Sequence, residues 1–169
     1  MTDTTPAWRP PTASERGRIL REARRIAIVG ASADPARASN FVATYLLSSS
    51  ADYHVDLIHP TETEILGRPV HPSLRDLPEP PDIVDVFRRA DQTPAVAAEA
   101  VAVGAKVLWL QLGIVNHEAA RIALEGGLEV VMDRCLKIEH ARFHGGLHLA
   151  GFDTGLIDSR RRRPARATR

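Results

Sequence analysis

The stretch Ile26-Ala-Ile-Val-Gly-Ala-Ser32 decides the fold of this chain. Its first four residues form a short apolar run, which predicts a strand that is buried on both faces. Gly30 ends the run and permits a sharp turn. Apolar side chains then recur at helical spacing over residues 41–46, and Ser39 or Asn40 is the expected N-cap of that helix. A strand, a tight turn and a helix in this order are typical of an α/β domain.

The same alternation continues through the rest of the chain. Further apolar runs predict strands at residues 53–58, 83–87, 106–110 and 128–132. The proline-rich residues 61–81 are expected to be irregular. Alternating strands and helices at this spacing predict parallel strands joined by right-handed crossovers. We therefore expect a doubly wound, Rossmann-like α/β domain, with a parallel five-stranded sheet in the order 3-2-1-4-5 and helices on both faces.

The composition is that of one globular domain. The chain has 169 residues, of which 44% are hydrophobic and 25% are charged, so a substantial core can form. Thr12 and Glu15 fit a capping box that starts a helix, since each side chain can bind the other's backbone amide. We expect a flexible N-terminal arm at residues 1–11, the folded domain at residues 12–145, and a C-terminal extension at residues 146–169 with a basic, disordered end.

Charge is unevenly distributed along the chain. Six of the 22 basic residues are arginines after position 159, which leaves 16 basic against 21 acidic groups in the preceding residues. Because the body is mildly acidic, we do not expect it to bind nucleic acid. The sequence shows neither an apolar run of membrane-spanning length nor the apolar segment of a secretory signal at its N-terminus. We therefore expect a cytoplasmic location without membrane association.

Candidate ligand-binding residues follow the predicted strands. Ligands of open parallel sheets bind outside the carboxyl ends of the strands, where the strand order reverses. The residues at these positions are Gly30, Ala31, Ser32, His59, Pro60, Phe87, Arg88, Arg89, Gln111, Gly113, Cys135 and Lys137. A helix N-terminus after Gly30 favours an anion, and the hydroxyls of Ser32 and Ser39 add donors. We expect this turn to bind phosphate.

Arg88 and Arg89 directly follow a predicted strand, and arginine can bind a phosphate or a carboxylate with two hydrogen bonds. The alternatives are that they are solvated or that they pair with Asp85, whose charge inside an apolar strand needs compensation. Gln111 and Gly113 offer a side-chain amide and a close backbone approach to a ligand, or they only shape their loop. The residues leave both sets of alternatives open.

A conventional dinucleotide site is disfavoured. The G-x-G-x-x-G pattern of such sites would place glycines at two positions where this chain has Ser32 and Pro35. Dinucleotide sites also use an Asp or Glu near the end of the second strand, where His59 and Pro60 provide no carboxylate. NAD is therefore not the expected ligand.

Two other patterns allow chemistry but also have structural explanations. Cys135 would be nucleophilic if Lys137 or a helix N-terminus favoured its thiolate; otherwise it is a small buried side chain. His140, His144 and His148 have the spacing of metal ligands on one helix face, but two glycines interrupt that helix. We expect neither catalysis by Cys135 nor a metal site.

Four stretches of the sequence carry a resemblance to a known family. They are Ile26-Ala-Ile-Val-Gly-Ala-Ser32, Val84-Asp-Val-Phe-Arg-Arg89, Gly104-Ala-Lys-Val-Leu-Trp-Leu-Gln-Leu-Gly-Ile114 and Val131-Met-Asp-Arg-Cys-Leu-Lys-Ile-Glu-His140. They resemble the small stand-alone CoA-binding proteins, which are related in fold to the N-terminal CoA-binding domain of the succinyl-CoA synthetase alpha subunit. The resemblance covers residues 15–142. It implies a Rossmann-like domain that holds coenzyme A (CoA) across the strand ends.

The resemblance also assigns candidate residues to parts of CoA. The diphosphate would lie against residues 30–40, which include Arg37 and Asn40. The nucleotide would lie along residues 87–89. The pantetheine arm would lie near residues 111–114, which end at Ile114. Residues 133–137 would close the site. His59-Pro60 stands where the family usually has Asn-Pro. The missing carboxylate suits CoA, because a carboxylate near the ribose would repel the ribose phosphate.

The resulting function hypothesis is binding of CoA or an acyl-CoA without catalysis. The synthetase chemistry needs a second domain with a phosphorylated histidine, for which the 29 residues after His140 leave no room. Two alternatives remain: an NAD(P)-binding oxidoreductase or redox sensor, and an adaptor that acts through the arginine-rich end. The sequence does not identify the acyl group. It also does not decide the oligomeric state, and a homodimer is possible.

Overall fold

The computed structural model describes residues 7–48 and 52–144, so the predicted C-terminal extension lies outside the described residues. The helices in this part of the chain are α1 (Ala13–Glu22), α2 (Ala38–Ser48), α3 (Thr93–Ala102), α4 (His117–Glu125) and α5 (Leu136–His144), with short 3-10 helices η1 (Leu74–Asp76) and η2 (Ala90–Gln92). The strands are β1 (Arg25–Val29), β2 (His54–Ile58), β3 (Glu64–Ile65), β4 (Arg68–His71), β5 (Ile83–Val86), β6 (Val107–Leu110) and β7 (Glu129–Val131). None of these helices is long and apolar enough to span a membrane.

The strands form one sheet in the order β3-β4-β2-β1-β5-β6-β7. All neighbours are parallel except β3 and β4. The doubly wound, Rossmann-like α/β class is therefore confirmed. The predicted number of five strands is wrong, and so is the place of residues 83–87: β5 lies beside β1, and β4 occupies the position next to β2. With β4 as the third parallel strand, the six parallel strands follow the order 3-2-1-4-5-6.

The two strands that the sequence does not predict, β3 and β4, lie in the proline-rich stretch. β3 and β4 form a hairpin whose two turn residues, Leu66 and Gly67, both have positive φ, at 53° and 70°. Such a two-residue turn matches the twist of an antiparallel pair. Pro69 lies within β4 without donating an amide, and Val70 pairs with Leu57 of β2. The prolines of this stretch mark its turns but do not exclude a short strand near the sheet edge.

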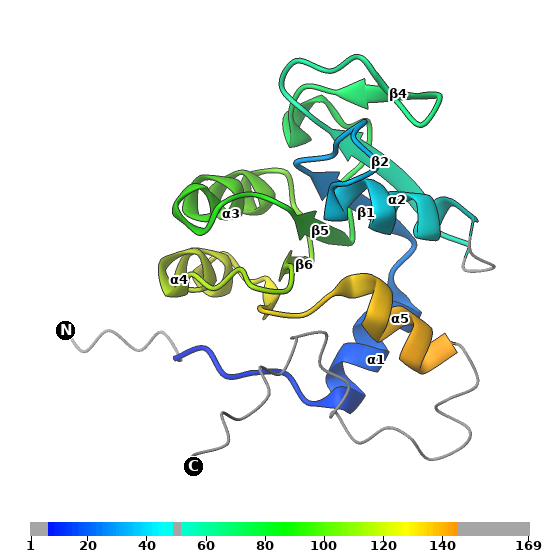
Figure 1. The fold of residues 1–169 in the computed structure, drawn as a ribbon. Helices are drawn as coiled ribbons and strands as arrows, with labels where there is room; N and C mark the ends of the chain where they lie inside the picture. Colours follow the sequence, from blue (N-terminus) through cyan, green and yellow to red (C-terminus); the bar gives the residue numbers. More distant parts are fainter. Residues whose placement is uncertain (1–6, 49–51, 145–169) are drawn as a thin grey trace, which may run out of the picture.

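Helices cover both faces of the sheet, as predicted. On one face, α1, α2 and α5 pack apolar side chains such as Leu20, Leu46 and Leu136 against the strands. On the other face, α3 and α4 lie side by side (Figure 1) and pack mainly through alanines such as Ala97 and Ala120. The core therefore has two layers, and the carboxyl ends of the parallel strands share one edge of the sheet.

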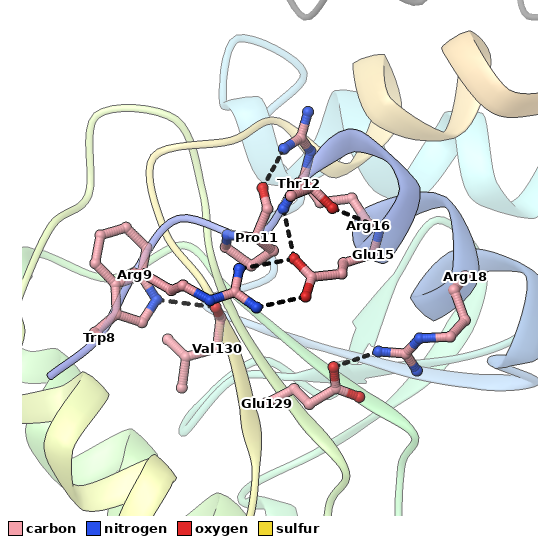
Figure 2. A network of polar contacts seen from close by, with 9 residues as sticks. All are labelled: Trp8, Arg9, Pro11, Thr12, Glu15, Arg16, Arg18, Glu129 and Val130. Carbon is pink, nitrogen blue, oxygen red and sulfur yellow. Dashed lines mark hydrogen bonds and ion pairs between the residues drawn. The ribbon is translucent and has the colours of Figure 1, made fainter. Parts of the chain in front are cut away.

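Part of the predicted N-terminal arm contacts the domain (Figure 2). The indole of Trp8 donates a hydrogen bond of 3.0 Å to the carbonyl oxygen of Val130, and Arg9 forms an ion pair of 2.6 Å with Glu15. The predicted capping box is confirmed, since Thr12 and Glu15 each bind the other's backbone amide. The Arg9 guanidinium and the Thr12 amide lower the pKa of Glu15 to about 2.

The N-cap predicted at Ser39 or Asn40 is wrong. α2 begins at Ala38, so Ser39 and Asn40 lie inside its first turn. The loop before α2 contains local turns that extend the helix by a residue or two beyond what periodicity shows. Gln92 is the N-cap of α3, and the hydroxyl of Thr93 donates to the carbonyl oxygen of Ala90. Asn116 caps α4.

Candidate ligand-binding site

A pocket of about 690 Å³ lies at the carboxyl ends of the central strands, within the size range of small-molecule sites. It opens beside the reversal of strand order, which falls between β1 and β5. Predicted site residues in its lining are Gly30, Ala31, Ser32, Arg37, Ser39, His59, Phe87, Arg88, Gln111, Ile114 and Cys135. The structure therefore brings most of the predicted residues together in one cavity.

Sequence reasoning missed the pocket-lining residues Phe41, Val42 and Ile138, and it included Ala38 and Leu112 only within the ranges 30–40 and 111–114. Most are apolar residues at helical spacing, which the sequence indicates only as core. Phe41 differs from a core residue, because 59% of its surface is exposed. Phe41 follows the predicted phosphate-binding turn closely in the sequence, and this proximity is what could have indicated that it lines the pocket.

Other predicted site residues lie outside the pocket lining, where they shape or border it. The side-chain amide of Asn40 donates a hydrogen bond of 2.9 Å to the carbonyl oxygen of Ser32 and so holds the loop before α2. The Gly113 amide donates to the Asp133 carboxylate at 2.7 Å, which joins the loops after β6 and β7. Pro60 also lies outside the lining. These contacts fix loops that carry pocket residues.

Lys137 and Arg89 lie outside the lining in different ways. The Lys137 ammonium lies 3.5 Å from the centre of the Phe41 ring, so a cation–π contact links α5 to α2 next to the pocket. Arg89 is exposed and lies 3.4 Å from the carboxylate of Asp91. Arg88, by contrast, lines the pocket. The structure thus separates two neighbouring arginines that the sequence treats alike.

The turn after β1 requires glycine at position 30. Gly30 has a φ of +85°, and a Cβ atom there would lie 2.6 Å from the carbonyl oxygen of Phe87. The backbone amides of Gly30 and Ala31 both donate to the carbonyl oxygen of Ile58, at 3.1 and 3.2 Å. These two amides are already used within the fold. Phosphate binding at this turn therefore depends on side chains and on amides further along the loop.

The pocket is basic although the body of the chain is acidic. Arg37 and Arg88 contribute positive charge, and none of the described lining residues is an Asp or Glu. The hydroxyls of Ser32 and Ser39 add polar groups on the same side. Asp34, which lies outside the lining, is 3.8 Å from Arg37, but no carboxylate belongs to the described lining itself. The lining therefore suits an anionic group such as a phosphate.

The opposite part of the pocket is largely apolar. Val42 belongs to α2, Ile138 to α5, and Leu112 and Ile114 to the loop after β6. Cys135 lies immediately before α5. The lining therefore changes from basic at Arg37, which follows β1, and Arg88, which follows β5, to apolar near β6 and α5. This gradient fits a ligand that has an anionic end and an uncharged end.

Asp85 is a buried carboxyl group directly behind the pocket lining. Its Oδ1 accepts a hydrogen bond of 2.5 Å from the side-chain amide of Gln111, and its Oδ2 has no hydrogen-bond partner. Burial raises the pKa of Asp85 to about 8, although the Gln111 amide acts in the opposite direction. The partner of Asp85 is therefore Gln111 and not Arg88 or Arg89. With a pKa of about 8, Asp85 is protonated at neutral pH, so it has no charge that needs compensation.

Replacing Asp85 with asparagine is expected to stabilise the protein in mildly alkaline solution. The unfolded carboxyl ionises near 3.8 and the folded one near 8, so the unfolded state binds fewer protons and wild-type stability falls as pH rises between these values. Asp85→Asn removes this loss, and we expect its free energy of unfolding at pH 8 to exceed that of the wild type by about 1–2 kcal/mol. Urea denaturation of the wild type and of Asp85→Asn at pH 5 and pH 8 measures the free energy of unfolding of each protein at each pH.

Asp82 provides a control, because its replacement is expected to change stability at pH 8 in the opposite direction. Burial acts to raise the pKa of Asp82, but the Lys106 ammonium and the amides of Arg24 and Arg25 outweigh it and lower the pKa. Asp82→Asn should therefore lose stability at pH 8. A wild type that is more stable than Asp85→Asn at pH 8 would contradict the assignment of Asp85 as a protonated group.

The Cys135 side chain is half-buried in the pocket wall. Burial raises the pKa of its thiol, with the backbone amides of Ile138 and Lys137 acting in the opposite direction. The thiolate is therefore scarce at neutral pH, and the thiol is a weak nucleophile. This environment agrees with the expectation that Cys135 is not catalytic.

The predicted histidine cluster links α2 to α5. The ring of His140 is hydrogen-bonded through Nδ1 to the Tyr45 hydroxyl at 2.8 Å and stacks on His144 with the ring centres 4.1 Å apart. Burial, assisted by His144, lowers the pKa of His140 to about 4. His148 lies outside the described residues. Within residues 7–48 and 52–144, no group of three His, Cys, Asp or Glu side chains could hold a metal ion.

Fold and pocket together place the chain in the class of doubly wound, Rossmann-like α/β proteins with a pocket at the strand ends. Residues 24–141 match the family described as the CoA binding domain. The chain is also 41% identical over 131 residues to the uncharacterized protein YneT of Bacillus subtilis, a match that covers 78% of this chain and 96% of YneT. The chain therefore belongs to the CoA-binding domain family.

Solved structures agree with this membership. A hypothetical protein from Pyrococcus horikoshii OT3 is 38% identical, with a TM-score of 0.75, over 80% of this chain and 96% of that protein. A dinucleotide-forming acetyl-coenzyme A synthetase from Ca. Korarchaeum cryptofilum is 27% identical, with a TM-score of 0.60. That match covers 64% of this chain but 26% of the synthetase. This chain thus resembles one part of a larger enzyme.

Proposed function

We propose that this chain binds CoA or an acyl-CoA in the pocket at the strand ends and does not itself catalyse a reaction. The observation that carries the proposal is the change of the pocket lining from basic to apolar. CoA combines a phosphorylated nucleotide with a long uncharged arm, so each part of this ligand has a matching part of the pocket. Membership of the CoA-binding domain family supports the same ligand.

The extent of the site suits a long ligand. His59 follows β2 and Cys135 follows β7, and four strand spacings separate these two strands in the sheet. At about 4.8 Å per spacing, the strand ends between them extend over about 19 Å. Arg88 lies between these limits, where a guanidinium can bind a diphosphate with two hydrogen bonds. The arm of the ligand would then lie along Leu112 and Ile138.

Binding without catalysis is supported by the state of the chemically reactive groups. Cys135, the nucleophile that the sequence singles out, has a raised pKa and is held as a thiol. Asp85 is fully buried and hydrogen-bonded to Gln111, so it does not contact a ligand directly. The pocket residues can therefore hold a thioester or a thiol without an evident group to attack it.

CoA is expected to bind at least about tenfold more tightly than NADH. NADH has free 2′ and 3′ hydroxyls on both riboses where CoA has a 3′-phosphate, and the described pocket lining has no carboxylate to accept from those hydroxyls. Titration calorimetry with both ligands measures the two affinities. Equal affinities would contradict the proposal, and so would the absence of heat with CoA at millimolar concentrations.

A further inference from the structure

His59 is held in one orientation at the end of β2. Its backbone amide donates to the carbonyl oxygen of His71 at 3.1 Å. Its ring Nδ1 accepts hydrogen bonds from two backbone amides, that of Thr61 at 3.1 Å and that of Glu62 at 2.9 Å. The imidazole therefore caps the turn that follows β2. The same half-buried side chain also lines the pocket.

These contacts decide which ring nitrogen carries the proton. A nitrogen that accepts two amide N–H groups has no proton of its own, so the neutral ring carries its proton on Nε2. With Nδ1 occupied, the remaining polar atom of the ring is a hydrogen-bond donor. His59 can thus donate to a ligand atom but cannot accept from one.

A donor at this position reverses the usual arrangement. In dinucleotide-binding folds of this topology, a carboxylate near the end of the second strand accepts hydrogen bonds from the ribose hydroxyls. His59 follows β2 directly and provides a donor there. A donor favours an acceptor on the ribose, and a phosphate is the strongest acceptor that a nucleotide ribose carries.

We infer that His59 selects for a nucleotide whose ribose is phosphorylated, by donating from Nε2 to that phosphate. The inference rests on the proposed function and names the part of CoA that His59 reads, its 3′-phosphate. The closest competitor is 3′-dephospho-CoA, which has the same diphosphate and the same pantetheine arm. Arg37 and Arg88 can bind the diphosphate of either ligand, so the difference between the two ligands isolates the ribose phosphate.

The test compares the affinities for CoA and 3′-dephospho-CoA by titration calorimetry. The wild type should prefer CoA by about tenfold, the value of one charge-assisted hydrogen bond. In His59→Asp, the carboxylate can still accept from the two turn amides but presents negative charge to the ribose. The preference for CoA over 3′-dephospho-CoA should fall below about twofold or reverse.

His59→Asn is the matched control. Its side-chain oxygen can accept from the turn amides and its NH₂ group can donate, so it should keep a preference for CoA, reduced by its shorter reach. A His59→Asp variant that keeps the full preference would overturn the inference. Equal binding of both ligands by the wild type would overturn this inference alone, whereas binding of neither would overturn the proposed function as well.

A second measurement tests the tautomer without a ligand. Long-range ¹H–¹⁵N correlation spectra of the full chain at neutral pH should show the His59 ring protonated on Nε2 and unprotonated on Nδ1. A ring that carries its proton on Nδ1 would overturn the inference, because the turn amides of Thr61 and Glu62 would then have lost their acceptor.

Discussion

Replacing Arg88 with alanine is expected to lower the affinity for CoA by about tenfold to a hundredfold. Arg88 lines the pocket immediately after β5, next to the turn at Gly30. Hydrogen bonds between a guanidinium and a phosphate are charge-assisted, and losing them costs about 1.5–3 kcal/mol, which corresponds to the expected range of affinity loss. Titration calorimetry with CoA measures it.

Arg89→Ala is the matched control for this prediction. Arg89 is the next residue in the chain and has the same charge, but it is exposed and paired with Asp91. Its removal should change the affinity by less than about threefold, because an exposed ion pair contributes little. Equal losses in both variants would indicate a general electrostatic attraction, and unchanged affinity in Arg88→Ala would remove Arg88 from the site.

Gly30→Ala is expected to reduce CoA affinity by more than about tenfold and to destabilise the domain by about 2–4 kcal/mol. Two effects add at this position. A φ of +85° is strained for any residue with a Cβ atom, and that atom would meet the Phe87 carbonyl oxygen at 2.6 Å. Relief of the clash must separate the ends of β1 and β5, between which the pocket opens. Urea denaturation and titration calorimetry measure the two effects.

Gly113→Ala separates the two effects. Gly113 has the same φ of +85°, but no atom lies within 4 Å of a Cβ placed there. This variant should show only the backbone strain, about 1 kcal/mol. A Gly30→Ala variant that is no less stable than Gly113→Ala would show that the close approach of Phe87 does not constrain the turn.

The sequence indicates the fold wherever the pattern is local. The apolar run and glycine at residues 26–30 predict β1 and its turn, and the other long apolar runs predict strands of the sheet. β4 was missed because it is short, contains Pro69 and owes its place to pairing with β2 and β3. Strand order was wrong for the same reason, since one unrecognised strand shifts the position assigned to every later one.

The same distinction between local pattern and long-range contacts applies to the candidate site. Topology alone places Gly30, His59 and Gln111 at one edge of the sheet, where the pocket lies. It does not distinguish Arg88 from Arg89, because the direction of each side chain depends on how the loop leaves β5. The orientation of His59 likewise depends on the turn at residues 61–62, which no periodicity indicates.

A crystal structure of the chain grown with CoA tests directly whether the pocket at the strand ends is the CoA site. We expect CoA across the carboxyl ends of the strands, with its diphosphate within hydrogen-bond distance of Arg88, its ribose phosphate at Nε2 of His59, and its arm along Leu112 and Ile138. CoA bound elsewhere on the molecule would contradict the proposed function. An empty pocket at CoA concentrations that saturate the protein in solution would contradict it equally.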